Sequence, residues 1–198
     1  ARDGRLVQEC GVGLVDLAVR DSGDDRRIAF NLPAAAVSPL REDDVDALEE
    51  VLGQAVERKV APAIIDVGPV WVVAQMPSVE ALLSVEPDFA QSAAFERRLG
   101  ATGISVFADN ETDDASIEVR SFAPSCGVDE DPVCGSGNGC VAVFRRERGL
   151  RIKDIASYTA TQGRCVGRDG HVTVEFGEAG QTIISGACVT SVDGVLRG

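Results

Sequence analysis

The segment EDPVCGSGNGC (130–140) brings acids, a thiol and bare backbone together in one short stretch of chain. After Cys134, glycines alternate with small or amide side chains, so backbone N–H groups near residues 135–138 can approach a ligand without obstruction. If a helix begins here, those N–H groups attract an anion, and a carboxylate fits as well as a phosphate. In a chain of formal net charge -13, an anionic substrate needs such a local array of donors, because the overall field repels it.

Two acids, Glu130 and Asp131, stand shortly before these glycines. Either carboxylate can accept a proton or hold an ammonium group. Pro132 forces Asp131 into an extended conformation, which can aim its side chain at the start of the predicted helix. An Asp before a helix is also a common cap, and glycines there are common turn residues. The segment lacks the GK[ST] of a phosphate-binding loop and matches the G-x-G-x-x-G dinucleotide fingerprint poorly.

The charge balance argues against two classes of partner. Lys and Arg number 19 against 32 Asp and Glu, and so acidic a chain repels phosphate backbones and anionic membranes. We therefore expect neither nucleic acid nor a membrane as a partner. The best apolar run, VGPVWVVAQM (67–76), is about half as long as the roughly 20 residues that a bilayer span needs.

Six cysteines are spread along the chain without a C-x-x-C pair, at positions 10, 126, 134, 140, 165 and 188. With a single histidine, His171, the chain has no His/Cys pattern for a metal ion, and we expect no metal site. Six cysteines are also few for a disulfide scaffold. We expect most of them, Cys134 apart, to be reduced and buried in a cytoplasmic protein.

The first part of the chain predicts strands followed by a helix. An acidic turn at 21–25 separates two apolar, alternating segments, which predicts a hairpin. The segment 38–53 predicts a helix with Ser38 as its cap, an apolar stripe on one side and Gly53 at its end. We expect the polar stretch 54–62 to be a linker between two domains.

That linker divides the chain into the late part of a first domain, 1–53, and a second domain, 63–198, whose last strand can return to the first. In the second domain, Ser78 and Asp88 are expected to cap two helices. Strands stand before and after one buried helix, which begins in the glycine-rich segment and ends at Gly149. This order predicts an α+β fold of mixed strand order, with the sheet curled around that helix.

Longer segments around the same residues resemble a known family. FAPSCGVDEDPVCGSGNG (122–139) is similar to the signature F-x-P-x-x-G-x-x-E-D-P-x-T-G-S-A of the PhzF-like isomerases of phenazine biosynthesis. TQGRCVGRDGHVTV (161–174) resembles the family's Q-G-x-x-x-G-R-x-G element. VGPVWVVAQMPSVEALLSVEPDF (67–89) is similar to its strand-then-helix segment. The resemblance covers nearly the whole chain.

The resemblance implies the fold of diaminopimelate epimerase: two similar domains, each a curled sheet around a central helix, with the active site in the cleft between them. It implies cofactor-free proton transfer on a small amino- or hydroxy-carboxylic acid by general acid/base catalysis. Asp131 would bind or polarise the polar group of that acid, and the N–H groups around Gly135 and Ser136 would hold its carboxylate. We expect Gly137 and Asn138 to complete the substrate-binding residues, and we expect no cofactor.

One departure from the family concerns the first domain. The family's proton-shuttling Glu and its G-N-P and G-H-P elements belong to the early part of that domain, and none is found in this chain. We therefore expect the chain to begin late in the first domain. It would then work as a homodimer or with a complementary segment, or else be an inactive, truncated paralogue that binds or dimerises.

A second departure is Cys134, which stands where the isomerases usually have Thr. VCGSGNGC (133–140) also resembles the A-C-G-S/T-G of diaminopimelate epimerase and proline racemase-type enzymes, in which that thiol is one of two catalytic bases. A cysteine at a helix N-terminus is expected to have a lowered pKa and thiolate character. Two chemistries therefore stay open: an isomerase that relies on Asp131, and a thiol-based epimerase that relies on Cys134.

Overall fold

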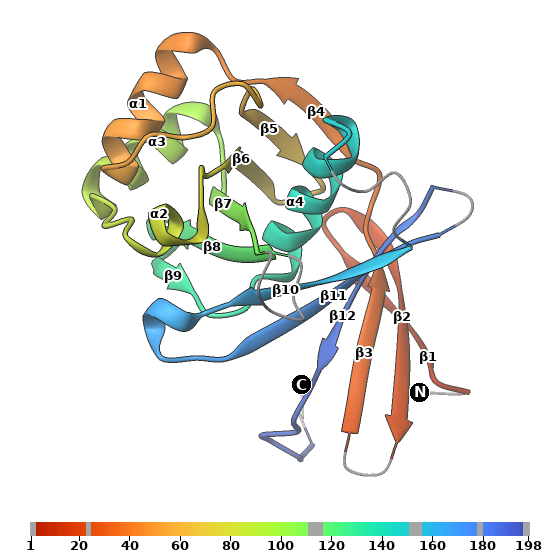
Figure 1. The fold of residues 1–198 in the computed structure, drawn as a ribbon. Coiled ribbons are helices and arrows are strands. Elements are labelled where there is room, and N and C mark those ends of the chain that lie inside the picture. Colours follow the sequence, from red (N-terminus) through yellow and green to blue (C-terminus); the bar gives the residue numbers. More distant parts are fainter. Residues whose placement is uncertain (1–2, 23–24, 111–116, 151–155, 178–179, 196–198) are drawn as a thin grey trace.

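The structure is a computed structural model that describes residues 3–22, 25–110, 117–150, 156–177 and 180–195. Its strands are β1 (Arg5–Cys10), β2 (Gly13–Ser22), β3 (Asp25–Asn31), β4 (Ala36–Pro39), β5 (Ala63–Asp66), β6 (Val70–Gln75), β7 (Gly103–Asp109), β8 (Ile117–Ala123), β9 (Val128–Asp131), β10 (Ser157–Gln162), β11 (Gly170–Phe176) and β12 (Thr182–Ala187). They form one sheet in the order β1-β2-β3-β12-β11-β10-β8-β7-β6-β5-β4, with β9 paired to β8 (Figure 1). Parallel pairs join β8 to β10 and β6 to β7, which gives the predicted mixed strand order.

The first strands form two hairpins. A two-residue loop closes β1 onto β2, with Cys10 facing Gly13, and Gly13 has a φ of 107°, which glycine adopts without strain. Strand β2 then pairs antiparallel with β3, which confirms the hairpin predicted around 21–25. Residues 23–24 of its turn lie outside the described residues. Strand β1 is exposed along its whole length, at one edge of the sheet.

Helix α1 (Glu42–Leu52) begins later than the sequence predicts. Ser38 does not cap it, because Ser38 and Pro39 lie in β4 and pair with β5. Strand β4 is the other edge of the sheet, where the missing N–H of a proline breaks no ladder. The N-cap is instead Arg41, whose side chain makes no capping hydrogen bond, and Gly53 ends the helix in the left-handed conformation, as predicted.

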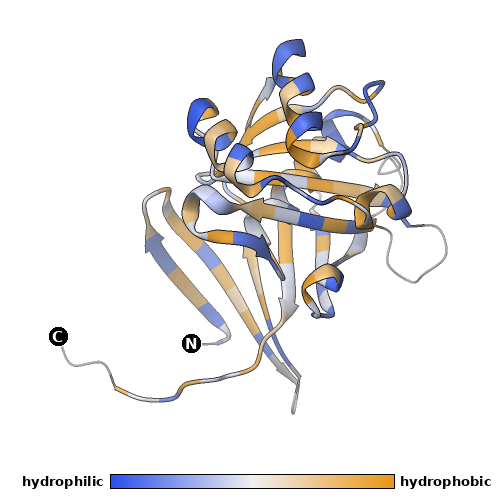
Figure 2. Cartoon of the chain, turned by 90° about the vertical axis from the view of Figure 1, so that its left-hand side faces the viewer, coloured by the Kyte–Doolittle hydropathy of each residue, from blue (hydrophilic) through white to orange (hydrophobic). Residues whose placement is uncertain are grey.

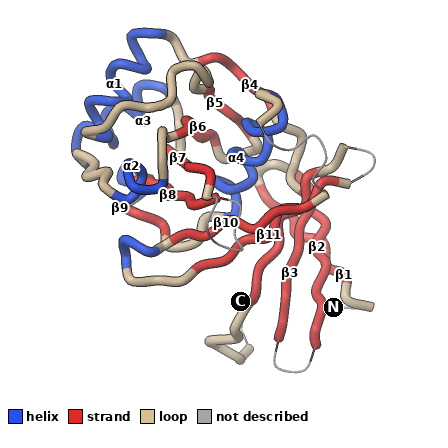
Figure 3. Tube along the Cα trace, viewed as in Figure 1, coloured by secondary structure: helices blue, strands red, loops and turns tan. Residues whose placement is uncertain are grey.

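Helices α2 (Val79–Leu83) and α3 (Phe89–Leu99) pack with α1 on one face of the sheet (Figure 3). Ser78 caps α2 and Asp88 caps α3, as predicted. Helix α1 shares one apolar core with α2, α3 and strands β6 to β8, so it packs against elements that follow residue 62. The division at 54–62 stays a prediction. No helix in the described part of the chain has both the length and the apolar character that crossing a membrane requires.

Helix α4 (Gly135–Glu147) lies on the other face of the sheet, which curls around it. It contacts β5, β6, β7, β11 and β12. Along β6, Trp71 and Val73 face α4, whereas Val72 and Ala74 face the core under the other three helices. Because both faces are covered, this strand is apolar from Val70 to Ala74. Figure 2 shows much of the sheet in the body in orange, the hydrophobic end of the scale, and parts of the covering helices in blue. The predicted sheet around a central helix is confirmed.

The strand β12 lies between β3 and β11, so strands from both ends of the chain are neighbours. Phe30 of β3 faces Ile184 of β12, and both pack against the core around α4. The next residue pair along these strands, Ala29 and Ser185, points to the opposite face, because strand side chains alternate. Figure 1 shows β1, β2 and β3 extending away from the compact body.

Candidate active site

Strand β9 carries Asp131 to the start of α4. Asp131 faces Ser121 of β8 across the sheet. The residue before it, Glu130, forms a bidentate ion pair with Arg120 of β8: Nε lies 3.0 Å from Oε1, and Nη2 lies 2.8 Å from Oε2. The two side chains are only 6% and 7% exposed. This geometry fixes the end of β9 and occupies the carboxylate of Glu130.

In the first turn of α4, two backbone N–H groups have no acceptor among the described residues. Cys134 is the N-cap: its Sγ accepts the N–H of Gly137 at 3.3 Å, and its carbonyl accepts the N–H of Asn138 at 3.1 Å. Within the described part of the chain, no hydrogen bond uses the N–H groups of Gly135 or Ser136. Both residues are half-buried. Two free donors at the positive end of a helix form a binding site for an anion.

A tryptophan holds the side chain of Ser136. Trp71 Nε1 donates to Ser136 Oγ at 3.1 Å, and Trp71 itself is buried. An indole N–H can only donate, so this bond occupies a lone pair of the hydroxyl and leaves its hydrogen for another acceptor. Cys134 Sγ lies 3.7 Å from the same Oγ, and either atom can donate in that contact. The Ser136 hydroxyl is therefore a third potential donor beside the two amides.

Asp131 lies next to this helix start. Its Oδ1 accepts the N–H of Val133 at 2.9 Å, and the residue is half-buried. Its negative charge is close enough to act on the thiol of Cys134. The structure thus brings a carboxylate, a thiol and free backbone donors together, in the arrangement that the segment 130–140 predicts.

The thiol of Cys134 is not the thiolate expected at a helix N-terminus. Cys134 is 5% exposed, and burial raises the pKa of its thiol to about 11. The N–H of Gly137 opposes this shift, and the charge of Asp131 adds to it. Desolvation of the charged form thus outweighs the favourable field of the helix. The expectation of a lowered pKa is wrong.

Gly137 and Asn138 lie beneath the site. Both are buried. A Cβ added at Gly137 would lie 2.6 Å from Ser105 Oγ and 2.9 Å from Ser121 Oγ. Asn138 Nδ2 donates to the carbonyl of Cys134 at 2.8 Å. The predicted residues therefore fall into a half-buried group, Asp131, Gly135 and Ser136, and a buried group that supports it, Cys134, Gly137 and Asn138.

Trp71 and Gln162 form hydrogen bonds to the predicted site residues but are not themselves part of the predicted site. Sequence patterns indicate that Trp71 belongs to the core, which is correct, but they do not show that its N–H reaches Ser136. Gln162 had a clearer signal, because it lies inside an element that resembles the family, TQGRCVGRDGHVTV (161–174). Its side chain contacts Asp131, Cys134 and Asn138.

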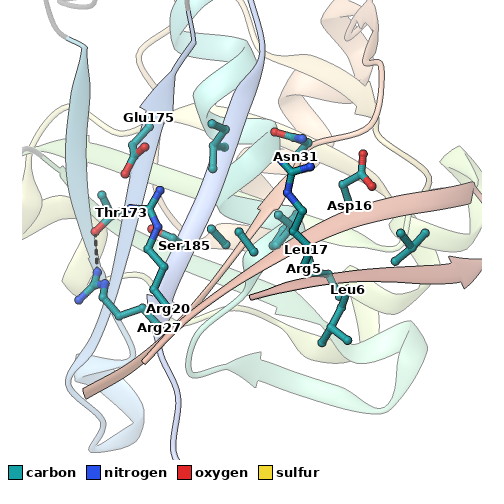
Figure 4. Close-up of a pocket in the computed structure, with 15 residues that line it drawn as sticks. Arg5, Leu6, Asp16, Leu17, Arg20, Arg27, Asn31, Thr173, Glu175 and Ser185 are labelled. Atoms are coloured by element: carbon teal, nitrogen blue, oxygen red, sulfur yellow. Dashed lines mark hydrogen bonds between the residues drawn. The ribbon is translucent and has the colours of Figure 1, made fainter. Parts of the chain in front are cut away.

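A separate pocket of about 450 Å³ lies on the face of the sheet that points away from α4 (Figure 4). Residues of β1, β2, β3, β11 and β12 line it, including Arg5, Arg20 and Arg27. Arg27 Nη2 donates to Thr173 Oγ1 at 3.1 Å across its floor. None of the predicted site residues lines this pocket.

All six cysteines are free thiols, but only Cys134 and Cys140 are buried. The expectation of burial is wrong for the other four, because they lie in the edge hairpin, in the 3-10 turns Pro124–Cys126 and Arg164–Val166, and after β12. Among the residues that the structure describes, no three His, Cys, Asp or Glu side chains gather closely enough to hold a metal ion.

Known proteins share this fold. The PhzF-family phenazine biosynthesis protein of Bacillus anthracis is 15% identical, with a TM-score of 0.77 over 92% of this chain and 65% of its own. A predicted epimerase of Pseudomonas aeruginosa is 19% identical, with a TM-score of 0.75 over 92% of this chain and 63% of its own. In sequence, the chain is 31% identical to antisense-enhancing sequence 1 of Schizosaccharomyces pombe, over 96% of this chain and 66% of the relative. An uncharacterized isomerase of the same organism is 32% identical over 73% of this chain and 80% of the relative.

The mixed sheet curled around a helix is thus a fold that this chain shares with a PhzF-family protein and with a predicted epimerase. The sequence model of the PhzC-PhzF family, described as phenazine biosynthesis-like protein, matches residues 1–194. The chain belongs to this family, and its curated relatives include proteins named as uncharacterized isomerases. It spans about two-thirds of the length of antisense-enhancing sequence 1 and of the two solved structures.

Proposed function

We propose that the chain carries the carboxylate-binding site of a cofactor-independent isomerase that moves a proton on a small amino- or hydroxy-carboxylic acid. The observation that carries this proposal is the pair of free N–H groups of Gly135 and Ser136 beside the carboxylate of Asp131. Two amides and one hydroxyl match the two oxygens of a carboxylate. In a protein of net charge -13, such donors localise an acid that the overall field repels.

Asp131 serves the polar group of the substrate in this proposal. As a carboxylate it accepts a hydrogen bond from an ammonium or hydroxyl group, and it can take up or return a proton. The reaction is redox-neutral: one carbon loses a proton and another carbon gains one. The amides at the start of α4 would hold the negative charge that develops on the carboxylate while the proton is absent.

The second proton-transfer group would come from a complementary segment or from a second copy of the chain. One observation supports this part of the proposal: β1 is exposed along its whole length and forms an edge of the sheet, where a further strand can pair. We also propose that the protein acts in a biosynthetic pathway in the cytoplasm, where six free thiols stay reduced.

The rival chemistry, a thiol-based epimerase, requires Cys134 to act as a base. Burial and a pKa of about 11 disfavour that role at neutral pH, since little of the thiol would be ionised. The third alternative, a paralogue that binds or dimerises without catalysis, predicts carboxylate binding and no proton exchange.

A proton-exchange experiment distinguishes the isomerase, the thiol-based epimerase and the non-catalytic binding protein. The chain is incubated in deuterated water with a panel of small 2-amino and 2-hydroxy acids, and label and optical purity are followed by NMR. An isomerase introduces label at one carbon without loss of optical purity, an epimerase racemises its substrate, and a binding protein introduces no label. Absence of both label and carboxylate binding across the panel would contradict the proposal.

Variants assign the residues. Asp131→Asn is expected to lower the exchange rate by about 10²–10⁴-fold, whereas the exposed neighbour Asp129→Asn is a matched control that keeps it. Cys134→Ser is expected to keep most of the activity, because a hydroxyl can also accept the N–H of Gly137. Loss of nearly all activity in Cys134→Ser would instead support the thiol epimerase.

A further inference from the structure

Gln162 is a buried amide at the end of β10. It is 1% exposed. Its backbone is fixed on both sides, facing Val119 of β8 and Gly170 of β11. A buried polar side chain is costly unless its donors and acceptors are paired, so the partners of Gln162 are informative.

Among the residues that the structure describes, every hydrogen-bond partner of the Gln162 side chain lies in the segment from Asp131 to Asn138. Oε1 accepts the backbone N–H of Cys134 at 3.2 Å and the side-chain N–H of Asn138 at 2.7 Å. Nε2 donates to the backbone carbonyl of Asp131 at 2.7 Å. One side chain therefore bonds to the end of β9, to the N-cap of α4 and to the first turn of α4.

The backbone around Gln162 also fits this segment closely. The carbonyl oxygen of Pro132 lies close to two glycines, Gly163 and Gly170. A Cβ added at Gly163 would lie 2.6 Å from this oxygen, and one added at Gly170 would lie 3.1 Å from it. Pro132 and Val133 are themselves exposed. The surface loop between β9 and α4 is thus held from its buried side, by Gln162 and by the bare backbone beside it.

We propose that Gln162 is a positioning residue, which holds the segment 131–138 so that the free N–H groups at the start of α4 and the carboxylate of Asp131 meet one ligand. This inference rests on the proposed function. The amide side chain suits this role, because it accepts from two N–H groups with its oxygen and donates to a carbonyl with its nitrogen. A methionine provides neither, and an ionised glutamate provides only the acceptors.

The test follows the site directly by NMR of the ¹⁵N-labelled chain, with acetate as the carboxylate probe. In the unaltered protein, acetate is expected to shift the amide signals of Gly135 and Ser136, and the amide of Cys134 is expected to exchange slowly with solvent. In Gln162→Met, we expect exchange at Cys134 to be at least tenfold faster and acetate binding to be at least tenfold weaker.

The variant Gln162→Glu distinguishes positioning from a general loss of stability. At pH 8 its carboxylate cannot donate to Asp131, so acetate binding is expected to be weak. At pH 5.5 the protonated acid regains the donor, since burial beside a carbonyl favours the neutral form. The acetate affinity of Gln162→Glu, divided by that of the unaltered protein at the same pH, should therefore rise at least fivefold from pH 8 to pH 5.5.

Thr161→Val is the matched control on the same strand. Thr161 is buried, and its hydroxyl lies within hydrogen-bond distance of the carboxylate of Glu118 and the carbonyl of Ile117, both on β8 and outside the segment 131–138. We expect it to lower the Tm without changing acetate affinity or exchange at Cys134.

The inference would be overturned if Gln162→Met left both the exchange at Cys134 and the acetate affinity unchanged. It would also be overturned if acetate binding to Gln162→Glu did not recover at low pH. Either result would leave the proposed function intact. If the unaltered protein neither binds acetate nor exchanges label, the proposed function fails and the positioning role fails with it. Faster exchange at Cys134 would then show only that Gln162 supports the fold.

Discussion

The starts of α3 and α4 solve the same physical problem in different ways. At α3, the carboxylate of Asp88 accepts the N–H groups of Ala90 and Gln91, both at 3.0 Å. At α4, the thiol of Cys134 accepts only the N–H of Gly137. Every helix start has orphan N–H groups. Helix α3 satisfies those of its second and third residues with its own carboxylate, whereas α4 leaves the N–H groups of its first two residues, Gly135 and Ser136, for a carboxylate from outside.

The two helix starts also differ in how they are supported. Asp88 is exposed, and the cap is formed by residues close in sequence. The start of α4 is held by buried residues from distant strands: Arg120 through Glu130, Trp71 through Ser136, and Gln162. A cap that serves only the fold can be local, whereas a site that must stay open needs support from the core.

The largest effect is expected when the buried support of α4 is removed. In Arg120→Met, Glu130 loses its ion-pair partner in a site where both side chains are 6–7% exposed. Removal of one partner from a buried pair costs about 3–5 kcal/mol, measured as the free energy of unfolding in urea. The control Arg58→Met removes exposed ion pairs with Asp46 and Glu49 and should leave stability close to that of the unaltered protein. Equal effects of the two variants would contradict the assigned support.

The next effect concerns the floor of the site. Gly137→Ala places a methyl group against Ser105 and Ser121, whose hydroxyls are buried and lie 2.6 Å apart. Such overpacking costs about 1–3 kcal/mol. In Gly135→Ala, the nearest atoms would be those of the Phe30 ring at 3.5 Å, an ordinary contact, so chemical denaturation should show unchanged or slightly higher stability. A tolerated Gly137→Ala would mean that the floor can move.

The two N-cap residues, Cys134 and Asp88, should limit stability at opposite ends of the pH range. The raised pKa of Cys134 means that its contribution is complete below the pKa of the unfolded thiol, near 9, and is lost as pH rises through about 11. At 1.36 kcal/mol for each pH unit, the chain should lose about 2 kcal/mol from this thiol between pH 8 and pH 11. Cys134→Ser should lack that part of the alkaline loss, while the loss caused by the raised pKa of Cys140 stays. Superimposable pH profiles would contradict the role of Cys134.

The smallest effect is expected at α3. Hydrogen bonds lower the pKa of the Asp88 carboxyl: the N–H of Gln91 has the largest effect, and the side chain of Gln91 and the N–H of Ala90 add smaller ones. Its contribution is therefore present above the usual pKa of an aspartate and is lost on acidification through the lowered value. Asp88→Ala should lower the Tm by less than Gly137→Ala does, and only where Asp88 is ionised. Acetate binding at α4 should be unchanged, and a weaker affinity would couple the two helix starts.

Much of the candidate site was accessible from the sequence because its residues are contiguous. Asp131, Cys134, Gly135 and Ser136 lie within six positions, and glycine spacing together with the buried helix behind it predicts their common location. The curled sheet was predictable for a similar reason, since α4 has strands before and after it and a buried first half.

Long-range packing explains what the sequence did not predict. Ser38 looks like a cap in its local context, but its pairing with β5 depends on residues more than twenty positions away. The thiol of Cys134 sits at a helix start that favours thiolate, yet burial by the surrounding strands reverses the shift. Gln162 reaches the site only because β10 pairs parallel to β8. Each outcome is set by tertiary contacts, which local patterns do not contain.

The neighbouring strands β3 and β12 are far apart in the chain, because most of the other elements lie between them. Phe30 of β3 faces Ile184 of β12, so β3 leaves the ribosome long before the strand that pairs with its inner edge is made. Isolated hairpins are marginal in water, and pairing between distant segments is slow. This seam of the sheet is therefore the last to close, and β1 to β3 are the strands on which a nascent-chain chaperone would be needed most.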